Sequence, residues 1–170
     1  MELPIVLFHF PSSHIHVIFV IPQCLSIRGL ILFPEMSTTA LPVQKYLDAL
    51  SRVLGGYIEK YPWCSEGQQQ WRIQESFNIQ MYKPKEGYTA WHCERPTATI
   101  PVICRHLVFM TYLNDLKDEG GETEWYHQKL KIRPEKGLTI IWPVDWPFTH
   151  RGIPSMTETK YITTGWYSYY

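Results

Sequence analysis

The sequence predicts a mainly β fold, a sandwich or jelly roll, with a helix beside it. Short runs rich in β-branched and aromatic residues recur from residue 71 onward, and turn-forming residues separate them at short intervals. One earlier stretch has the period of a helix instead. The chain of 170 residues has the length of one ordinary domain and can bury a core without a metal or a disulfide.

Charge and cysteine content exclude several classes of protein. Lys plus Arg equals Asp plus Glu at 16 each, without a dense basic run, so we expect no nucleic-acid partner but a small molecule or another protein. The oligomeric state is not predicted. The four cysteines, Cys24, Cys64, Cys93 and Cys104, lack a Cys-x-x-Cys spacing, which is typical of reduced thiols rather than of a disulfide framework or a zinc site. A cytoplasmic location follows as the expectation.

The first 35 residues differ in character from the rest. Residues 3–27 carry no Asp, Glu, Lys or Arg, a length that could cross a membrane, but Pro4, Pro11 and Pro22 interrupt it. The only earlier charge is Glu2, whereas a secretory signal needs a basic start. We expect no membrane association. Since Met36 opens a segment that reads as the start of a soluble protein, we predict an N-terminal extension of undefined order at 1–35 and the functional domain at 36–170.

The helix is expected from Pro42 onward. Pro42 suits a first helical turn, and Gly55-Gly56 marks the expected end. One apolar face between these residues is formed by Val43, Tyr46, Leu47, Leu50 and Leu54. This helix is predicted to pack on the main body as a scaffold.

The strands are expected after a loop at 63–70. The segments rich in β-forming residues are 71–83, 88–94, 105–113, 122–132, 138–142, 148–151 and 160–169. Turn signals lie between them at 84–87, 114–121 and 134–137. Bulky aromatic residues in this half suit strand faces and the walls of a binding cleft, among them Trp125, Trp142, Trp146 and Trp166.

One strand carries a candidate pair of metal ligands, His92 and Glu94. Side chains at i and i+2 of a strand point to the same face, so both could reach one ion. Cys93 lies between them and should face the core on the other side. Alone, the pair also fits a histidine at a strand edge beside a solvated glutamate. His150 follows 58 residues after His92, and Lys160 ten residues later.

Together these residues resemble the Fe(II)- and 2-oxoglutarate-dependent dioxygenases, most closely their prolyl 4-hydroxylase-like branch. The resemblance covers about residues 71–168 and implies a double-stranded β-helix (jelly roll) with one or more flanking helices. Five elements in the family's order are more specific than any one of them. The elements are Tyr82-Lys83-Pro84, His92-x-Glu94, Leu113-Asn114-Asp115 with Gly120-Gly121-Glu122-Thr123, Pro134-x-Lys136-Gly137, and His150 with Lys160.

The resemblance implies that His92, Glu94 and His150 are the catalytic metal ligands. Two imidazoles and one carboxylate form the facial triad of non-haem iron, which leaves three coordination positions open. By the resemblance, 2-oxoglutarate takes two of these positions and O₂ the third. Most relatives have Asp where this chain has Glu94, which is one methylene longer but has the same charge. The presence of a carboxylate argues against the halogenating relatives, which lack this ligand.

The resemblance also assigns the 2-oxoglutarate contacts. Lys160 would bind the far carboxylate of this co-substrate with its ammonium group. Tyr82 best matches the family's tyrosine hydroxyl, but one extra residue separates it from the metal-binding histidine, so Tyr88 is an alternative. Thr123 matches a third, weaker hydroxyl contact. Ascorbate is a candidate additional cofactor.

The implied reaction hydroxylates an unactivated C–H bond and gives succinate and CO₂ as co-products. The substrate is left open between a prolyl peptide, a free amino acid and another small molecule. One alternative is a catalytically inactive jelly-roll module that binds a metal or ligand, but the complete triad with Lys160 favours an enzyme. Another alternative is a cupin-like metal enzyme without 2-oxoglutarate, against which Lys160 argues.

Overall fold

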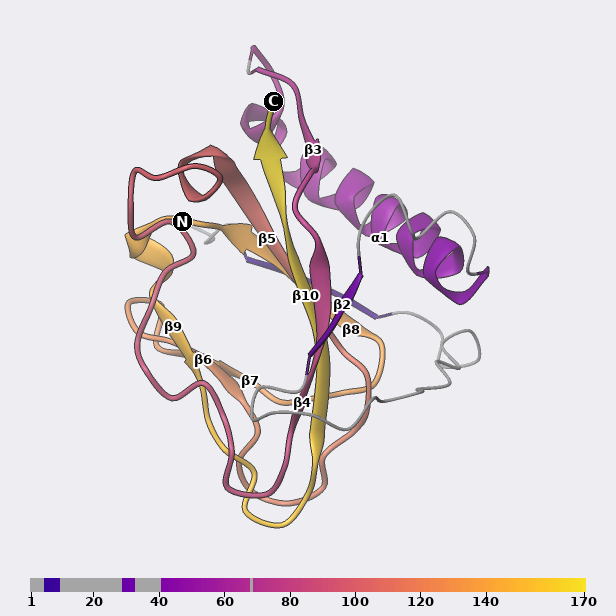
Figure 1. The fold of residues 1–170 in the computed structure, drawn as a ribbon, viewed down its shortest axis with the longest axis vertical. Coiled ribbons are helices and arrows are strands. Elements are labelled where there is room, and N and C mark those ends of the chain that lie inside the picture. Colours follow the sequence, from indigo (N-terminus) through magenta and orange to yellow (C-terminus); the bar gives the residue numbers. More distant parts are fainter. Residues whose placement is uncertain (1–4, 10–28, 33–40, 68) are drawn as a thin grey trace.

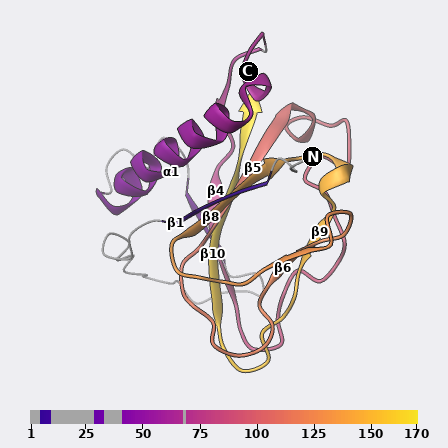
Figure 2. The ribbon, with the colours of Figure 1, turned by 180° about the vertical axis from the view of Figure 1, so that it is seen from behind.

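Two antiparallel sheets face each other in the computed structural model, and one long helix covers the outside of the larger sheet (Figures 1 and 2). The structure describes residues 5–9, 29–32, 41–67 and 69–170. The helix α1 is Leu41–Lys60, and short 3-10 turns occur at Pro62–Cys64, Val102–Cys104 and Trp146–Phe148. The strands are β1 Val6–His9, β2 Gly29–Leu32, β3 Trp71–Ile73, β4 Phe77–Tyr82, β5 Arg105–Tyr112, β6 Thr123–Trp125, β7 Leu130–Ile132, β8 Leu138–Pro143, β9 His150–Gly152 and β10 Lys160–Tyr169.

The order of the strands is that of a jelly roll. The larger sheet runs β1-β8-β5-β10-β4-β2, with β3 also paired to β10. The smaller sheet runs β7-β6-β9, and an isolated bridge joins His92 to His150 at the free side of β9. Strands from separate parts of the chain thus alternate between two facing sheets. The predicted double-stranded β-helix with a flanking helix is confirmed.

Strand alternation divides the interior into two hydrophobic cores. Leu107 and Phe109 of β5 face outward and pack with Leu50 and Tyr57 of the helix. The intervening side chains of β5 face the space between the sheets, together with apolar residues of β6, β7, β8 and β10. Because both faces of β5 are covered, its middle is a continuous apolar run from Leu107 to Met110. The inner face of the larger sheet also forms one wall of the candidate site.

The predicted end of the helix at Gly55-Gly56 is wrong, because α1 continues to Lys60. Tyr57 lies beyond both glycines on the same apolar face as Leu50 and Val53, and only 1% of it is exposed. Burying a side chain of this size stabilises the fold by ~1.5–3 kcal/mol. That gain offsets much of the ~1 kcal/mol by which each glycine disfavours a helix.

Several predicted strands are confirmed and others are corrected. The segments 105–113, 138–142 and 160–169 correspond closely to β5, β8 and β10. The segment 71–83 divides into β3 and β4, and 122–132 folds back on itself as the hairpin β6–β7. In the segment 148–151, the strand begins only at His150 because a 3-10 turn precedes it. These differences are breaks within correctly placed β segments.

The predicted strand at 88–94 is absent apart from the bridge at His92. The backbone of this segment bonds to two different parts of the chain. The carbonyl of Tyr88 accepts from Gly152 in β9, whereas the amide of Glu94 donates to the carbonyl of Val144, after β8. A regular ladder requires one continuous partner strand, which this segment lacks.

Two short pieces of the predicted extension 1–35 pair with the larger sheet. Val6–His9 pair with Leu138–Ile141 of β8, and Gly29–Leu32 pair with Phe77–Gln80 of β4. Ile5 is also described and packs against the core between the sheets, whereas the remaining residues of 1–35, including Cys24, lie outside the described residues. Within the described residues, no helix has both the length and the apolar character needed to cross a membrane. The domain boundary at Met36 stays a prediction.

We expect a protein that begins at Met36 to remain folded. The strands β1 and β2 occupy the two ends of the sheet order, so their removal leaves β5 and β10 paired on both sides. If the free energy of unfolding falls by ~2–3 kcal/mol, the melting temperature should fall by roughly 5–10 °C. Circular dichroism melting and gel filtration of both lengths would measure this. Aggregation of the shorter protein would instead assign residues 1–35 to the core.

Candidate metal centre and cavity

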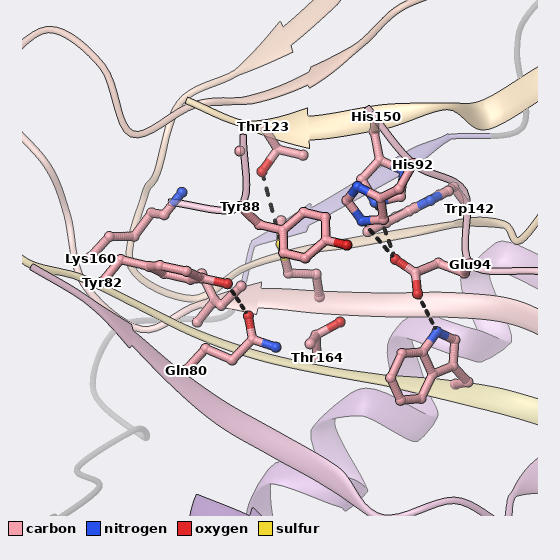
Figure 3. A pocket seen from close by; sticks show the side chains of 14 residues that line it. Gln80, Tyr82, Tyr88, His92, Glu94, Thr123, Trp142, His150, Lys160 and Thr164 are labelled. Carbon is pink, nitrogen blue, oxygen red and sulfur yellow. Dashed lines mark hydrogen bonds and ion pairs between the residues drawn. The ribbon is translucent and has the colours of Figure 1, made fainter. Parts of the chain in front are cut away.

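A cavity of about 230 Å³ opens between the two sheets. Side chains at alternate positions of β4 and β10 form much of its wall, as expected for one face of each strand. All the site residues predicted from the sequence, with Tyr88, line this cavity (Figure 3). The full lining is Gln80, Tyr82, Tyr88, His92, Glu94, Met110, Thr123, Trp142, His150, Gly152, Lys160, Ile162, Thr164 and Trp166.

Three possible metal ligands meet at one end of the cavity. The Nε2 atoms of His92 and His150 each lie 3.3 Å from Oε1 of Glu94. The two imidazole rings are 4.3 Å apart between centroids. One ligand atom from each of the three residues lies within 4.8 Å of the others. Although 88–94 is not a regular strand, His92 and Glu94 therefore face the same point.

The backbone fixes which ring nitrogens face that point. Nδ1 of His92 lies 3.0 Å from the carbonyl oxygen of Ala90, and Nδ1 of His150 lies 2.9 Å from that of Phe148. A carbonyl only accepts, so each Nδ1 must carry a proton and donate it. In the neutral ring, Nε2 then has a free lone pair, which is the form that binds metals.

The lone pairs of Nε2 in both histidines therefore face an oxygen of Glu94, which creates a site for a cation. Burial raises the pKa of the Glu94 carboxyl, but in the absence of a cation His150 and His92, when protonated at Nε2, donate hydrogen bonds to it, which outweigh burial and hold this pKa well below its usual range. Burial is the largest single effect on His92 and lowers its pKa, but the hydrogen bond and charge of Glu94, together with the carbonyls of Ala90 and His150, outweigh burial, so the net shift is upward. A shared cation would remove the repulsion among three acceptor atoms.

The donor set and spacing fit a small divalent ion. Neighbouring ligands about 2.1 Å from an octahedral ion lie about 3 Å apart, close to the N–O separations of 3.3 Å found here. Two imidazole nitrogens with one carboxylate oxygen are the ligands of non-haem Fe(II) sites. Trp125 and Trp142 pack around the ring of His150 and exclude water from that side. The residues present thus fit iron.

Lys160 lies at the opposite end of the cavity from the two histidines (Figure 3). Only 4% of this residue is exposed, and its ammonium donates to the carbonyl of Gly121 at 3.0 Å. Burial lowers the pKa of Lys160 to about 8, although the charge of Glu122 opposes this shift. Among the described residues, no carboxylate forms an ion pair with Lys160. A buried ammonium without a counter-ion is suited to bind an anion.

The two arginines that offer alternative cations are already paired. Arg105 forms an ion pair of 2.7 Å with Glu75, and Arg151 forms one of 2.8 Å with Glu124. Neither arginine lines the cavity. Of the residues that the structure describes, Lys160 is therefore the cation available to an acid that enters the cavity.

The two candidate tyrosines differ in position. Tyr82 lies directly across from Lys160 in the pairing of β4 with β10, and the ammonium is 5.4 Å from the centroid of its ring. The Tyr82 hydroxyl donates to Oε1 of Gln80. Tyr88 instead packs edge-on against His92, at 4.3 Å between centroids, and 54% of it is exposed. Tyr82 thus belongs to the ammonium end, and Tyr88 to the metal end beside the opening.

Thr123 is buried in the wall formed by the smaller sheet. Its hydroxyl accepts a hydrogen bond of 2.7 Å from Tyr112 and contacts the sulfur of Met110 at 3.9 Å. The hydroxyl is therefore held in place by protein groups. Its location in the lining agrees with the predicted weak contact, which stays a prediction.

Further lining residues were not singled out as ligand contacts by sequence reasoning. Gln80 and Thr164 lie between the two ends of the cavity (Figure 3). Trp166 donates from its indole nitrogen to Oε2 of Glu94 at 3.0 Å. Their signal in the sequence is the period of two that places them on the same strand faces as Tyr82 and Lys160.

The other predicted roles are only partly matched. Trp142 and Trp166 line the cavity, Trp125 is buried behind His150, and Trp146 is 68% exposed, outside the lining. Cys93 is half-buried and belongs to neither hydrophobic core, so its predicted core role is not supported. Cys93, Cys64 and Cys104 are free thiols.

Comparisons with known proteins agree on one family. The model of the 2OG-Fe(II) oxygenase superfamily matches residues 77–168, which include all the predicted site residues. No protein with a curated description matches the sequence.

Several solved structures of similar fold are prolyl hydroxylases. The viral collagen prolyl hydroxylase of Paramecium Bursaria Chlorella virus-1, in its 2OG complex, is 22% identical with a TM-score of 0.65, over 85% of this chain and 80% of that one. A prolyl-4-hydroxylase of Pseudomonas putida is 16% identical with a TM-score of 0.62, over 85% and 72% of the two chains. A Trichoplax adhaerens prolyl hydroxylase in complex with a hypoxia inducible factor peptide fragment is 18% identical with a TM-score of 0.62, over 84% and 62%.

Proposed function

Because the chain belongs to the 2OG-Fe(II) oxygenase superfamily, we propose that it couples the oxidative decarboxylation of 2-oxoglutarate to the hydroxylation of an unactivated C–H bond. The family implies Fe(II) and 2-oxoglutarate as cofactor and co-substrate, with O₂ as oxidant. The observation that carries the proposal is the convergence of three acceptor atoms at one end of a cavity whose other end holds a buried ammonium.

The proposed roles follow from these contacts. Nε2 of His92, Nε2 of His150 and Oε1 of Glu94 would hold the iron, which supplies the binding and activation of O₂ and of the 2-oxo acid end. Lys160 would bind the far carboxylate and so orient the acid along the cavity. Tyr82 lies next to Lys160 and supports the same carboxylate in this proposal, with Thr123 as the weaker contact.

We propose a peptidyl substrate, with a prolyl residue as the first candidate. The charged side chains of the lining are those of Glu94 and Lys160, beside the two histidines. Both have roles toward the iron and the co-substrate, so no described lining residue remains to pair with the ammonium and carboxylate of a free amino acid. Exposed Tyr88 offers an aromatic surface beside His92 that suits an apolar ring. Ascorbate use and a cytoplasmic location stay predictions from the sequence.

The test is succinate formation by the iron-loaded protein. Protein loaded with Fe(II) and 2-oxoglutarate without oxygen is then exposed to O₂, with a proline-containing peptide, free proline or no substrate. Substrate-dependent succinate with a product heavier by one oxygen atom is the expected result. Iron binding without any succinate would favour the inactive binding module. Oxidation that does not need 2-oxoglutarate would favour the cupin-like alternative.

Affinity for 2-oxoglutarate is expected to decrease as the pH rises through about 8. The pKa of Lys160 lies at about 8 because burial disfavours its charged form. Above this pH the ligand-free protein loses the ammonium, and binding the acid requires its reprotonation, which costs up to about tenfold in affinity per pH unit. Lys160→Arg is the control, because arginine stays charged and should remove the decrease. Anaerobic titrations from pH 6.5 to 9.5 would measure it, and a flat wild-type profile would contradict it.

A further inference from the structure

The two oxygens of the Glu94 carboxylate have different surroundings. Oε1 lies 3.3 Å from both histidines, whereas Oε2 accepts a hydrogen bond of 3.0 Å from the indole nitrogen of Trp166. Nη1 of Arg105 lies 3.7 Å from the same Oε2. Figure 3 shows this carboxylate between the histidines on one side and an indole ring on the other. Trp166 and Arg105 thus hold Oε2, whereas Oε1 faces the metal position between the two histidines.

Arg105 is itself fixed from several directions. Its guanidinium binds both carboxylate oxygens of Glu75, with 2.9 Å from Nε to Oε1 and 2.7 Å from Nη2 to Oε2. Nη1 donates to the backbone carbonyl of Glu94 at 3.0 Å. The guanidinium also stacks on the ring of Trp166, 3.6 Å from its centroid. The side chains of Arg105 and Glu75 are each 14% exposed, so water competes little for these bonds.

A glutamate ligand needs such a restraint more than an aspartate does. Its additional rotatable bond allows the carboxylate to turn and present both oxygens to one ion. A second bond from the carboxylate would take one of the three positions that a facial triad leaves open. The hydrogen bond from Trp166 and the ion pair with Arg105 oppose this turn, because the turn would move Oε2 away from both groups.

We propose that Trp166 and Arg105 are positioning residues that hold Oε2 of Glu94, so that Glu94 binds the metal through Oε1 alone. This inference rests on the proposed function, in which Glu94 is a metal ligand. Trp166 acts directly on the carboxylate. Arg105 fixes the indole ring and the backbone of Glu94 together.

The main test is the affinity and visible spectrum of bound Co(II) in Trp166→Phe, with Co(II) as the probe for the iron site. Phenylalanine keeps an aromatic ring but removes the N–H donor. Loss of a partner that orients a metal ligand typically lowers metal affinity about 10- to 100-fold. We expect a loss in this range, with a changed Co(II) absorption band as the carboxylate changes its binding mode. Trp71→Phe, on the outer face of the same sheet, is the control and should match the wild type.

A second comparison separates positioning from general packing. In Glu94→Asp the shorter side chain cannot reach both the metal and the indole. Trp166→Phe should therefore change Co(II) affinity by less than about threefold when Asp occupies position 94. If Trp166→Phe does not fold, Arg105→Lys is measured in both backgrounds instead, since lysine keeps the charge but lacks the fork.

Two results would overturn the inference while leaving the proposed function in place. Wild-type affinity and spectrum in Trp166→Phe would show that the indole does not restrain Glu94. An equal loss of affinity with Glu or Asp at position 94 would reduce Trp166 to a packing role. Failure of the unchanged protein to bind Co(II) would instead remove the metal site, and the proposed function with it.

Discussion

Changing His150 to Ala is expected to abolish stoichiometric Fe(II) binding and, with it, all turnover. His150 is buried, its Nδ1 is held by the carbonyl of Phe148, and its Nε2 faces the same oxygen of Glu94 as His92 does. Removing it leaves two ligands instead of three. Anaerobic titration with Fe(II), or with Co(II) as a stable substitute, would measure the loss.

A matched control separates ligand loss from a general effect of removing a histidine. His127 is exposed and outside the cavity lining, so His127→Ala should bind iron as the wild type does. The thermal melting of ligand-free His150→Ala tests whether the variant is folded. Full metal occupancy in folded His150→Ala would remove the proposed ligand set.

Changing Lys160 to Ala is expected to lower affinity for 2-oxoglutarate by about 30-fold or more, with Fe(II) affinity nearly unchanged. Lys160 is buried, and within the described part of the chain its ammonium donates a hydrogen bond only to the carbonyl of Gly121. Truncating one partner of a desolvated charge pair costs ~2–5 kcal/mol, and each ~1.4 kcal/mol is tenfold. An anaerobic titration that follows the metal-to-ligand charge-transfer band would measure it. Lys160→Arg should recover part of the affinity.

Two further variants make the result specific. Lys45→Ala, on the exposed side of α1, should leave 2-oxoglutarate affinity unchanged. Lys160→Met keeps most of the length of the side chain without its charge, so it should bind the acid as poorly as Lys160→Ala does. Unchanged affinity in Lys160→Ala would contradict the proposed co-substrate, because Arg105 and Arg151 are already paired with carboxylates.

Lys160→Met should also stabilise the ligand-free protein. Burial lowers the pKa of Lys160 from 10.5 to about 8, so the charged form is less favourable in the folded than in the unfolded chain. This destabilisation is fully present below pH 8 and disappears as the pH rises toward 10.5. At pH 7 its removal is worth roughly 3 kcal/mol, since one pKa unit is about 1.4 kcal/mol. The buried ammonium of Lys160 therefore destabilises the ligand-free protein but provides the charge that binds an anion.

The sequence predicts the regular parts of this fold well, for a physical reason. In β5, β8 and β10, local propensity and burial agree, so their composition alone marks them as strands. The helix end and the segment 88–94 depend on distant contacts instead. Burial of Tyr57 carries α1 past two glycines, and the backbone partners of 88–94 come from separate parts of the chain. Propensity contains neither kind of information.

The candidate site likewise combines residues that the sequence reveals with contacts that depend on the fold. His92, Glu94, His150 and Lys160 form a spaced pattern that a single sequence reveals. The contact of Trp166 with Glu94 depends on how β10 aligns with β5, where Trp166 lies across from Val108. Glu75 precedes its partner Arg105 by 30 residues and follows no motif that we identified. Such supporting contacts become visible only after the strands are placed side by side.

The strand β10 also fixes the distance between the two ends of the cavity. Lys160 and Trp166 lie six residues apart on it, roughly 20 Å of extended chain. The strand is paired with β4 and β5 on its two sides, so the separation between its side chains cannot easily change. In the proposed function, one end of the co-substrate is held near Lys160 and the other near the ligand that Trp166 restrains. The co-substrate is much shorter than this span, so the Lys160 side chain and the metal ligands must reach inward to cover the rest, and the paired strand keeps their two starting points at a constant separation.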